Sequence, residues 1–163
     1  MPALSEGKLA PQISLPDTGG KQFSLKNALA RGPALLAFFK ISCPVCQFAM
    51  PIIERLHQAY PGATIVGVSQ NPKQDTEGFR RQYGVTFPTL LDDPAHYVAS
   101  NAYGLTNVPS IFLVSAEGNI EVSCVGWNRK DVEKMNSLLA RAEGAKPAQL
   151  FRPGEDIPDF KAG

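Results

Sequence analysis

The sequence lacks the features that mark membrane-spanning, nucleic-acid-binding or disulfide-stabilised proteins. Its longest strongly apolar run, Ala34–Phe39, is far shorter than the ~20 residues that a membrane helix requires, and no basic-then-apolar leader opens the chain. Sixteen Lys and Arg residues against fifteen Asp and Glu give a net charge of +1, so no global field attracts nucleic acid. Three cysteines are too few for a disulfide scaffold. We therefore expect a globular protein with no membrane span and no nucleic-acid partner.

The composition is that of one ordinary domain. The chain has 163 residues, of which 44% are hydrophobic and 19% charged, and this is enough to bury a substantial core. The stretch 143–163 is rich in Gly and Pro and shows little periodicity, which indicates an extended arm. We predict a single domain over residues 1–163, with its core at about 8–142 and the arm at 143–163.

A strand, a helix and a second strand form the centre of the predicted fold. Ala34–Phe39 is a continuous apolar run, as expected of a strand that is covered on both faces. From Cys43 to about Tyr60 the apolar residues fall at helical spacing, and Thr64–Ser69 is short and β-branched. In a βαβ unit of this kind the two strands are parallel.

The rest of the chain supplies strands and helices around this unit. Helices are predicted at 24–30, 72–82, 94–102 and 128–142, the first and last capped by Ser24 and Asn128. Strands are predicted at 12–15, 88–91, 110–114 and 120–125, the last two forming an antiparallel hairpin. The predicted fold class is α/β, with a mixed central sheet of about five strands and helices on both faces.

Two of the cysteines, Cys43 and Cys46, lie at the start of the central helix, just beyond the end of the first central strand. Open α/β sheets place their sites at this edge. A thiolate at a helix N-terminus is stabilised by unpaired backbone N–H groups and by the helix dipole, and Pro44 suits the first helical position. The two thiols can close a disulfide, but so short a loop removes only ~2 kcal/mol of unfolded-state entropy. The pair therefore makes more sense as a redox couple than as a structural disulfide.

Two other interpretations of the pair stay open: both thiols are inert core residues, or they are half of a zinc site. Tetrahedral zinc needs four ligands, and the remaining candidates are only Cys124, His57 and His96. Cys124 alternates with apolar residues on its predicted strand, so we expect a buried core thiol, and neither histidine is assigned a catalytic role. We expect no metal, and no cofactor other than a redox-active Cys43–Cys46 disulfide.

The segment Ala34–Pro51, which contains Cys43-Pro44-Val45-Cys46, resembles the active-site segment of the thioredoxin superfamily. Thioredoxins carry a proline at the position of Pro51, and Val108-Pro109-Ser110 resembles their cis-proline loop. The lead-in Ala10-Pro11 and the segment FPTLLDD resemble the redoxin branch, which contains TlpA/ResA-type thiol-disulfide oxidoreductases and AhpC/TSA peroxiredoxins. The resemblance covers about residues 8–141 and is specific for the fold.

This resemblance implies a thioredoxin-like three-layer fold and a thiol-disulfide oxidoreductase. In such an enzyme Cys43 attacks a protein or small-molecule disulfide, Cys46 resolves the mixed disulfide, and a thiol electron donor returns the electrons. The loop Val108-Pro109 would position the substrate chain. The residues between the cysteines, Pro44-Val45, would contact substrate and help to tune the redox potential.

The chain departs from the family at the acidic residue that assists proton transfer. Thioredoxins carry this residue six positions before the first cysteine, where this chain has Ala37. ResA-like proteins carry one after the next strand, where the nearest position here is Asn71. No carboxylate base is apparent. Lys40 is the charged residue closest in sequence to Cys43, and it either favours the Cys43 thiolate as a cation or is simply a solvated lysine at a strand end.

A peroxiredoxin-like thiol peroxidase that reduces hydroperoxides is the alternative function. The peroxidatic cysteine of that family follows the pattern Pro-x-x-x-Thr-x-x, which precedes neither Cys43 nor Cys46. Ser42 and Arg129 stay candidates for orienting a peroxide. A non-enzymatic binding module with the same fold is a third interpretation.

The expected compartment is the cytoplasm, because Met1 begins the chain without a leader. A removed leader would reverse this expectation and place the protein outside the cytoplasm, where TlpA/ResA relatives work.

Overall fold

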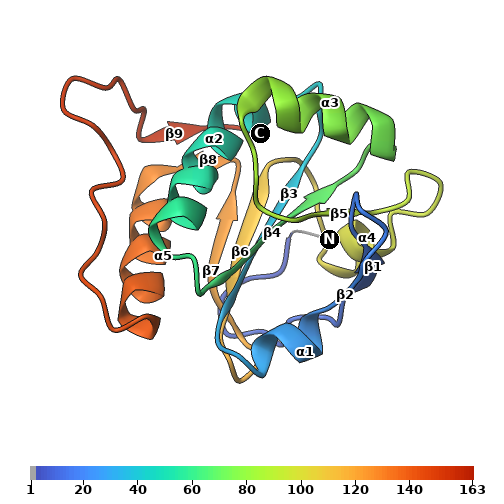
Figure 1. The fold of residues 1–163 in the computed structure, drawn as a ribbon, viewed down its shortest axis with the longest axis horizontal. Coiled ribbons are helices and arrows are strands. Elements are labelled where there is room, and N and C mark those ends of the chain that lie inside the picture. The colour runs from blue at the N-terminus through green and yellow to red at the C-terminus, as the bar shows by residue number, and fades with distance from the viewer. Residues whose placement is uncertain (1–2) are drawn as a thin grey trace.

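A mixed sheet of five strands runs through the middle of the computed structural model, which describes residues 3–163 (Figure 1). The strand order is β5-β4-β3-β6-β7. The strands β3 (Ala34–Phe39), β4 (Thr64–Ser69) and β5 (Thr89–Leu91) are parallel to one another. The strands β6 (Ser110–Val114) and β7 (Ile120–Val125) each run antiparallel to the strand before them in this order. The parallel strands β3 and β4, with the helix that connects them, form the βαβ unit that the sequence predicts.

Alternate side chains of β3 build two cores, one on each face of the sheet. Its odd-numbered residues belong to the core under α2 (Pro44–Ala59), α3 (Lys73–Tyr83) and α5 (Arg129–Ala142). Its even-numbered residues belong to the opposite core, under α1 (Leu25–Leu29) and α4 (Val98–Ala102). Helices therefore cover both faces of the sheet, which confirms the predicted three layers (Figure 1). None of the helices within residues 3–163 combines the length and the apolar character that crossing a membrane requires.

The structure differs from the predicted elements at the periphery. The strand β1 (Ser14–Pro16) begins two residues later than predicted and pairs with β2 (Gln22–Ser24), which is too short to show a period in the sequence. The helix α4 begins at Val98 rather than near residue 94. Tyr97, just before it, has a left-handed backbone with φ of 48°, which an α-helix cannot contain.

The arm at 143–163 packs on the domain. Leu150 is buried in the core under α2 and α5. Arg55 of α2 forms an ion pair with Glu155 of the arm, in which Nη1 and Oε1 are 2.8 Å apart. Near the end of the arm, β9 (Phe160–Lys161) pairs with β8 (Trp127–Asn128), a pairing that the sequence did not indicate. The arm therefore ends close to the first turn of α2 (Figure 1).

Candidate active site

Cys43 is the N-cap of α2, and its sulfur faces the first turn of the helix. Its Sγ accepts a hydrogen bond from the backbone N–H of Cys46 at 3.1 Å, and Pro44 follows at the first helical position. Both cysteines are free thiols; Cys43 is half-buried, whereas Cys46 is fully buried. The outer thiol of the pair is therefore Cys43, at the helix N-terminus.

Burial separates the two thiols chemically. Burial raises the pKa of the Cys46 thiol well above its ordinary range, and the hydrogen bond with Cys43 adds to this effect. Cys46 therefore stays protonated at neutral pH in the dithiol form. Cys43, by contrast, is half-buried, and a backbone N–H points at its sulfur.

The loop before β6 lies against Cys43 from the other side. The peptide bond between Val108 and Pro109 is cis, in agreement with the resemblance to the cis-proline loop. The Cys43 thiol donates to the Val108 carbonyl oxygen at 3.4 Å, and the Pro109 carbonyl accepts from the Gly126 N–H at 2.7 Å. The structure thus brings Val108-Pro109 next to Cys43, as the sequence predicts. Val45 is half-buried in the first turn of α2.

Two amide side chains hold the loop between β3 and α2. The backbone N–H of Ile41 donates to Asn71 Oδ1, and Gln47 Nε2 donates to the Ile41 carbonyl, each at 2.9 Å. In the sequence, Asn71 stands only at the position of a missing carboxylate, and nothing marks Gln47 as part of a site. Both residues hold the segment that leads into Cys43. No motif reveals them, because Asn71 lies far from its partner Ile41 in the sequence and Gln47 bonds to a backbone carbonyl.

Lys40 is directed toward α4. Its Nζ lies over the ring of Tyr97, 5.9 Å from the ring centroid. Both side chains border a polar hollow of about 210 Å³, which Asn101, Asn107 and Val108 also line. A chain that lies along Val108 would find polar groups on this side of the loop. The effect of Lys40 on the Cys43 thiolate stays a prediction.

Glu54, in the middle of α2, is a buried carboxylate. It is only 9% exposed and accepts hydrogen bonds from the backbone N–H groups of Thr86 and Phe87, at 2.8 and 3.2 Å. Burial alone would raise the pKa of Glu54, but hydrogen bonds from Thr86 and Gln58 outweigh it and lower the pKa below its ordinary value. Glu54 is therefore an ionised residue that ties α2 to the segment before β5.

Cys124 is buried, as the sequence predicts, and the two histidines make local contacts. Cys124 is fully buried, and burial raises the pKa of its thiol to about 12. His57 packs edge-on against Phe87, and His96 pairs with Asp93 on the surface. Across residues 3–163, His, Cys, Asp and Glu side chains form no group of three or more that could hold a metal ion.

The two side chains considered for orienting a peroxide are placed differently. Arg129 donates to Glu133 and to the Ile157 carbonyl, and its guanidinium lies 4.6 Å from the centroid of the Phe151 ring. These contacts commit the guanidinium to α5 and the arm. Ser42 is exposed beside Cys43.

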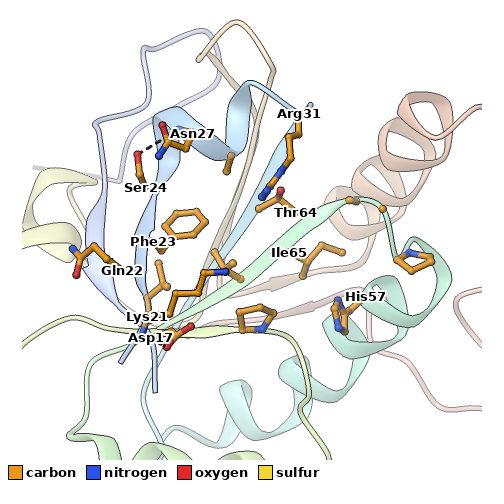
Figure 2. Close-up of a pocket in the computed structure, with 17 residues that line it drawn as sticks. Asp17, Lys21, Gln22, Phe23, Ser24, Asn27, Arg31, His57, Thr64 and Ile65 are labelled. Carbon is orange, nitrogen blue, oxygen red and sulfur yellow. Dashed lines mark hydrogen bonds between the residues drawn. The ribbon is translucent and has the colours of Figure 1, made fainter. Parts of the chain in front are cut away.

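A second pocket lies at the opposite end of the sheet from the cysteines. Its volume is about 510 Å³, and it opens between α1, β2 and the beginning of β4 (Figure 2). Lys21 and Arg31 extend toward β4 in this pocket, and His57 borders it (Figure 2). Since β3 and β4 are parallel and Cys43 follows the far end of β3, this pocket has no part in the chemistry of the thiols.

Known proteins resemble both the sequence and the fold. Residues 7–123 match the AhpC/TSA family. The thiol-disulfide oxidoreductase ResA of Geobacillus thermodenitrificans is 30% identical over 132 residues, which cover 79% of this chain and 74% of that protein.

Two solved structures share the architecture. The thioredoxin domain of a thiol-disulfide oxidoreductase from Bacteroides vulgatus has a TM-score of 0.72 at 24% identity, over 82% of this chain and 96% of that one. A thiol:disulfide interchange protein from Bacteroides sp. has a TM-score of 0.71 at 24% identity, over 83% of this chain and 90% of that one. These two show a thioredoxin-like fold. With the family match and the ResA relative, the chain belongs to the AhpC/TSA family of thioredoxin-like redoxins and is a thiol-disulfide oxidoreductase.

Proposed function

We propose that Cys43 is the attacking thiolate of this oxidoreductase and that Cys46 is the resolving thiol. The observation that carries the assignment is the position of Cys43 as the N-cap of α2, half-buried and 3.1 Å from the Cys46 N–H. Cys46 is fully buried and held as a thiol, so it cannot be the first of the two to meet a substrate.

The reaction proceeds by two exchanges of sulfur bonds. The Cys43 thiolate attacks one sulfur of the substrate disulfide; a Cys43–substrate bond forms, the substrate S–S bond breaks, and the departing sulfur leaves with the electron pair and takes up a proton. Cys46 then loses its proton and attacks the Cys43 sulfur, which releases the second substrate thiolate and forms the Cys43–Cys46 disulfide. The substrate gains two electrons and the enzyme loses two. A thiol donor then reduces the Cys43–Cys46 disulfide and returns the enzyme to its dithiol form.

The substrate is a protein or small-molecule disulfide held along the loop Val108-Pro109, with Pro44-Val45 on the other side of the attacking sulfur. The Val108 carbonyl already accepts from Cys43, so a chain that pairs with this loop has its disulfide within reach of the thiolate. Lys40 stays a candidate for favouring that thiolate. The location of the protein in the cytoplasm stays a prediction from the sequence.

Single cysteine variants test the assignment. With a chromogenic aromatic disulfide as substrate, Cys43→Ser is expected to lose at least 100-fold in rate, and Cys46→Ser is expected to retain the first exchange and to accumulate a mixed disulfide, visible by mass spectrometry. Cys124→Ser is the matched control and is expected to exchange at the wild-type rate. Retention of fast exchange in Cys43→Ser would refute the assignment, because another thiol would then be the attacking group.

Hydrogen peroxide separates the alternative peroxidase from the oxidoreductase. The reduced protein is expected to lose its Cys43 thiol to low-micromolar peroxide no faster than a free thiol does. A rate that is orders of magnitude higher would make peroxide the physiological oxidant and would identify this chain as a thiol peroxidase.

A further inference from the structure

The end of the arm lies on the backbone that borders the attacking sulfur. In the β8–β9 pairing, Lys161 stands opposite Trp127 and Phe160 opposite Asn128. The ammonium of Lys161 lies 5.7 Å from the centroid of the Phe48 ring, which belongs to the first turns of α2. Residues 160–163, which we call the arm tip, therefore lie beside the start of α2.

Two glycines permit this close approach. A Cβ at Gly163 would overlap the Val108 carbonyl oxygen and would come within 2.5 Å of Asn107 Nδ2. A Cβ at Gly126 would lie 2.5 Å from the Lys161 carbonyl oxygen and 3.0 Å from the Gly163 nitrogen. The arm tip is thus in backbone contact with both Val108 and Gly126.

These are the backbone groups on which a substrate chain would have to lie. The Val108 carbonyl accepts from the Cys43 thiol, and the Gly126 N–H is bonded to the Pro109 carbonyl, so the cis-proline loop and Gly126 form one continuous surface next to the sulfur. Two polypeptide segments cannot pack against the same backbone atoms at once. A substrate chain and the arm tip therefore exclude each other, whereas a small disulfide needs only the half-buried sulfur.

The tip is held weakly, but the segment before it is held firmly. The pairing of β9 spans two residues, and the side chain of Phe160 is 60% exposed. Upstream, the indole N–H of Trp127 donates to the Pro158 carbonyl at 2.7 Å, and the Arg129 N–H donates to the Asp159 carbonyl at 2.9 Å. A substrate chain can displace the tip while the anchored residues before it keep it at a high effective concentration.

We propose that the arm tip is a specificity-determining segment that occupies the substrate-chain position beside Val108, so that it slows exchange with disulfides carried on polypeptide chains and leaves exchange with small disulfides unhindered. This inference rests on the proposed function of Cys43. It predicts that loss of the tip widens the range of substrates.

Two substrates with the same leaving group provide the test. One is cysteine and the other is a short unstructured peptide with a single cysteine, each activated as a mixed disulfide with the same coloured aromatic thiol. Release of that thiol after mixing with reduced protein gives the rate of the first exchange for both. The ratio of the peptide rate to the cysteine rate isolates the effect of the chain from the reactivity of Cys43.

Removing residues 160–163 deletes the tip and leaves Pro158 and Asp159 bonded to Trp127 and Arg129. The peptide rate is expected to rise about tenfold and the cysteine rate to change less than twofold. Gly163→Ala, whose added Cβ pushes the tip from Val108, is expected to raise the peptide rate in the same direction without shortening the chain. Gly78→Ala, where a Cβ meets no atom within 4 Å, is the control.

A ratio that is unchanged or lower in both tip variants would overturn the inference, since the tip would then be neutral or would assist binding. Failure of the proposed function gives a different result: the wild-type protein would release the coloured thiol from both substrates no faster than a free thiol, or Cys43→Ser would release it equally well.

Discussion

At the scale of single residues, the two thiols of the pair differ in burial and therefore in readiness to react. Cys43 is half-buried with a backbone N–H on its sulfur, whereas Cys46 is fully buried and has a raised pKa. Neither Ala37 nor Asn71 offers a carboxylate to remove the proton of Cys46. In the proposed mechanism, the second exchange, in which Cys46 attacks, is consequently the step that depends most on an external base.

The decay of the mixed disulfide is expected to accelerate with pH. Because burial raises the pKa of Cys46, only a small fraction is ionised at neutral pH, and this fraction grows about tenfold per pH unit below the pKa. Rapid mixing, acid quench and mass spectrometry from about pH 6 to about pH 8 would follow the decay directly. A decay that does not change over this range would show that a group inside the protein takes the proton.

Replacement of Glu54 by Gln is expected to lower the free energy of unfolding by about 1 to 3 kcal/mol at neutral pH, because buried N–H groups lose a charged acceptor. The folded-state pKa of Glu54 lies below its ordinary value of 4.5, so its contribution is fully present above pH 4.5 and is lost as the pH falls through the folded-state pKa. Denaturant unfolding of the wild type and of Glu54→Gln should therefore show a difference in the free energy of unfolding that becomes smaller below pH 4.5.

Glu117→Gln, on an exposed turn, is the control for this substitution, and its free energy of unfolding is expected to equal that of the wild type. A constant difference between wild type and Glu54→Gln down to about pH 2 would contradict an ionised role for Glu54.

The positions of the candidate site residues could be predicted where local sequence determines them. Cys43 and Cys46 are recognisable because helix-start spacing after a buried strand is local, and Val108-Pro109 because it forms part of a family motif. Gln47 and Glu54 look like ordinary polar helix residues in the sequence. Gln47 donates to the backbone of the loop before α2, and Glu54 accepts from backbone N–H groups of the segment before β5, contacts that no pattern within α2 can show.

At the scale of elements, the packing of β4 against its neighbours depends on the absence of a side chain at Gly67. Gly67 is paired with Ala37 on β3 and Thr89 on β5. A Cβ there would lie 2.9 Å from the Phe87 ring and 3.1 Å from the Phe39 ring. The two aromatic rings fill the space that a larger residue would need.

Alanine at two glycines is expected to have opposite effects on stability. Gly67→Ala should lower the free energy of unfolding by about 1 to 3 kcal/mol, because the rings around it must shift. Gly78→Ala, in open space within α3, should raise it by about 0.5 to 1 kcal/mol through helix propensity. Denaturant titration of the two variants checks both signs, and a destabilised Gly78→Ala would mean that α3 is more closely packed than its surroundings indicate.

Elements with a clear period could be predicted, and short ones could not. The six residues of β3 are all apolar because both of its faces are covered, and this gives a strong signal. The pairings of β1 with β2 and of β8 with β9 involve two or three residues each, so their existence depends on what the tertiary fold brings together. The start of α4 depends on the left-handed backbone of Tyr97, which its residue type does not favour.

At the scale of the whole molecule, the arm joins α2 and α5 from outside. Tyr60 at the end of α2 donates its hydroxyl hydrogen to Asn136 of α5 and accepts from the Ala148 N–H of the arm. Leu150 is buried close by, and Arg55 is paired with Glu155. The sequence indicated an irregular segment here but not where it packs, because its contacts reach up to 100 residues back along the chain.

Truncation at two points should separate the anchored part of the arm from its tip. Removal of residues 146–163 is expected to lower the free energy of unfolding by about 3 to 5 kcal/mol, from the loss of the buried Leu150 and of several hydrogen bonds. Removal of 160–163 alone should cost less than about 1 kcal/mol. Chemical unfolding of both truncated proteins measures the difference, and equal losses would mean that the tip is the main anchor.

Trp127 is the only tryptophan in the chain, and it lies where the arm meets α2. Its indole N–H is bonded to the Pro158 carbonyl, and its ring meets the Phe48 ring edge-on, with 5.0 Å between centroids. Detachment of the arm would expose this indole to water and shift its emission to longer wavelengths. The molecule therefore carries an intrinsic fluorescent reporter of arm docking that needs no added label.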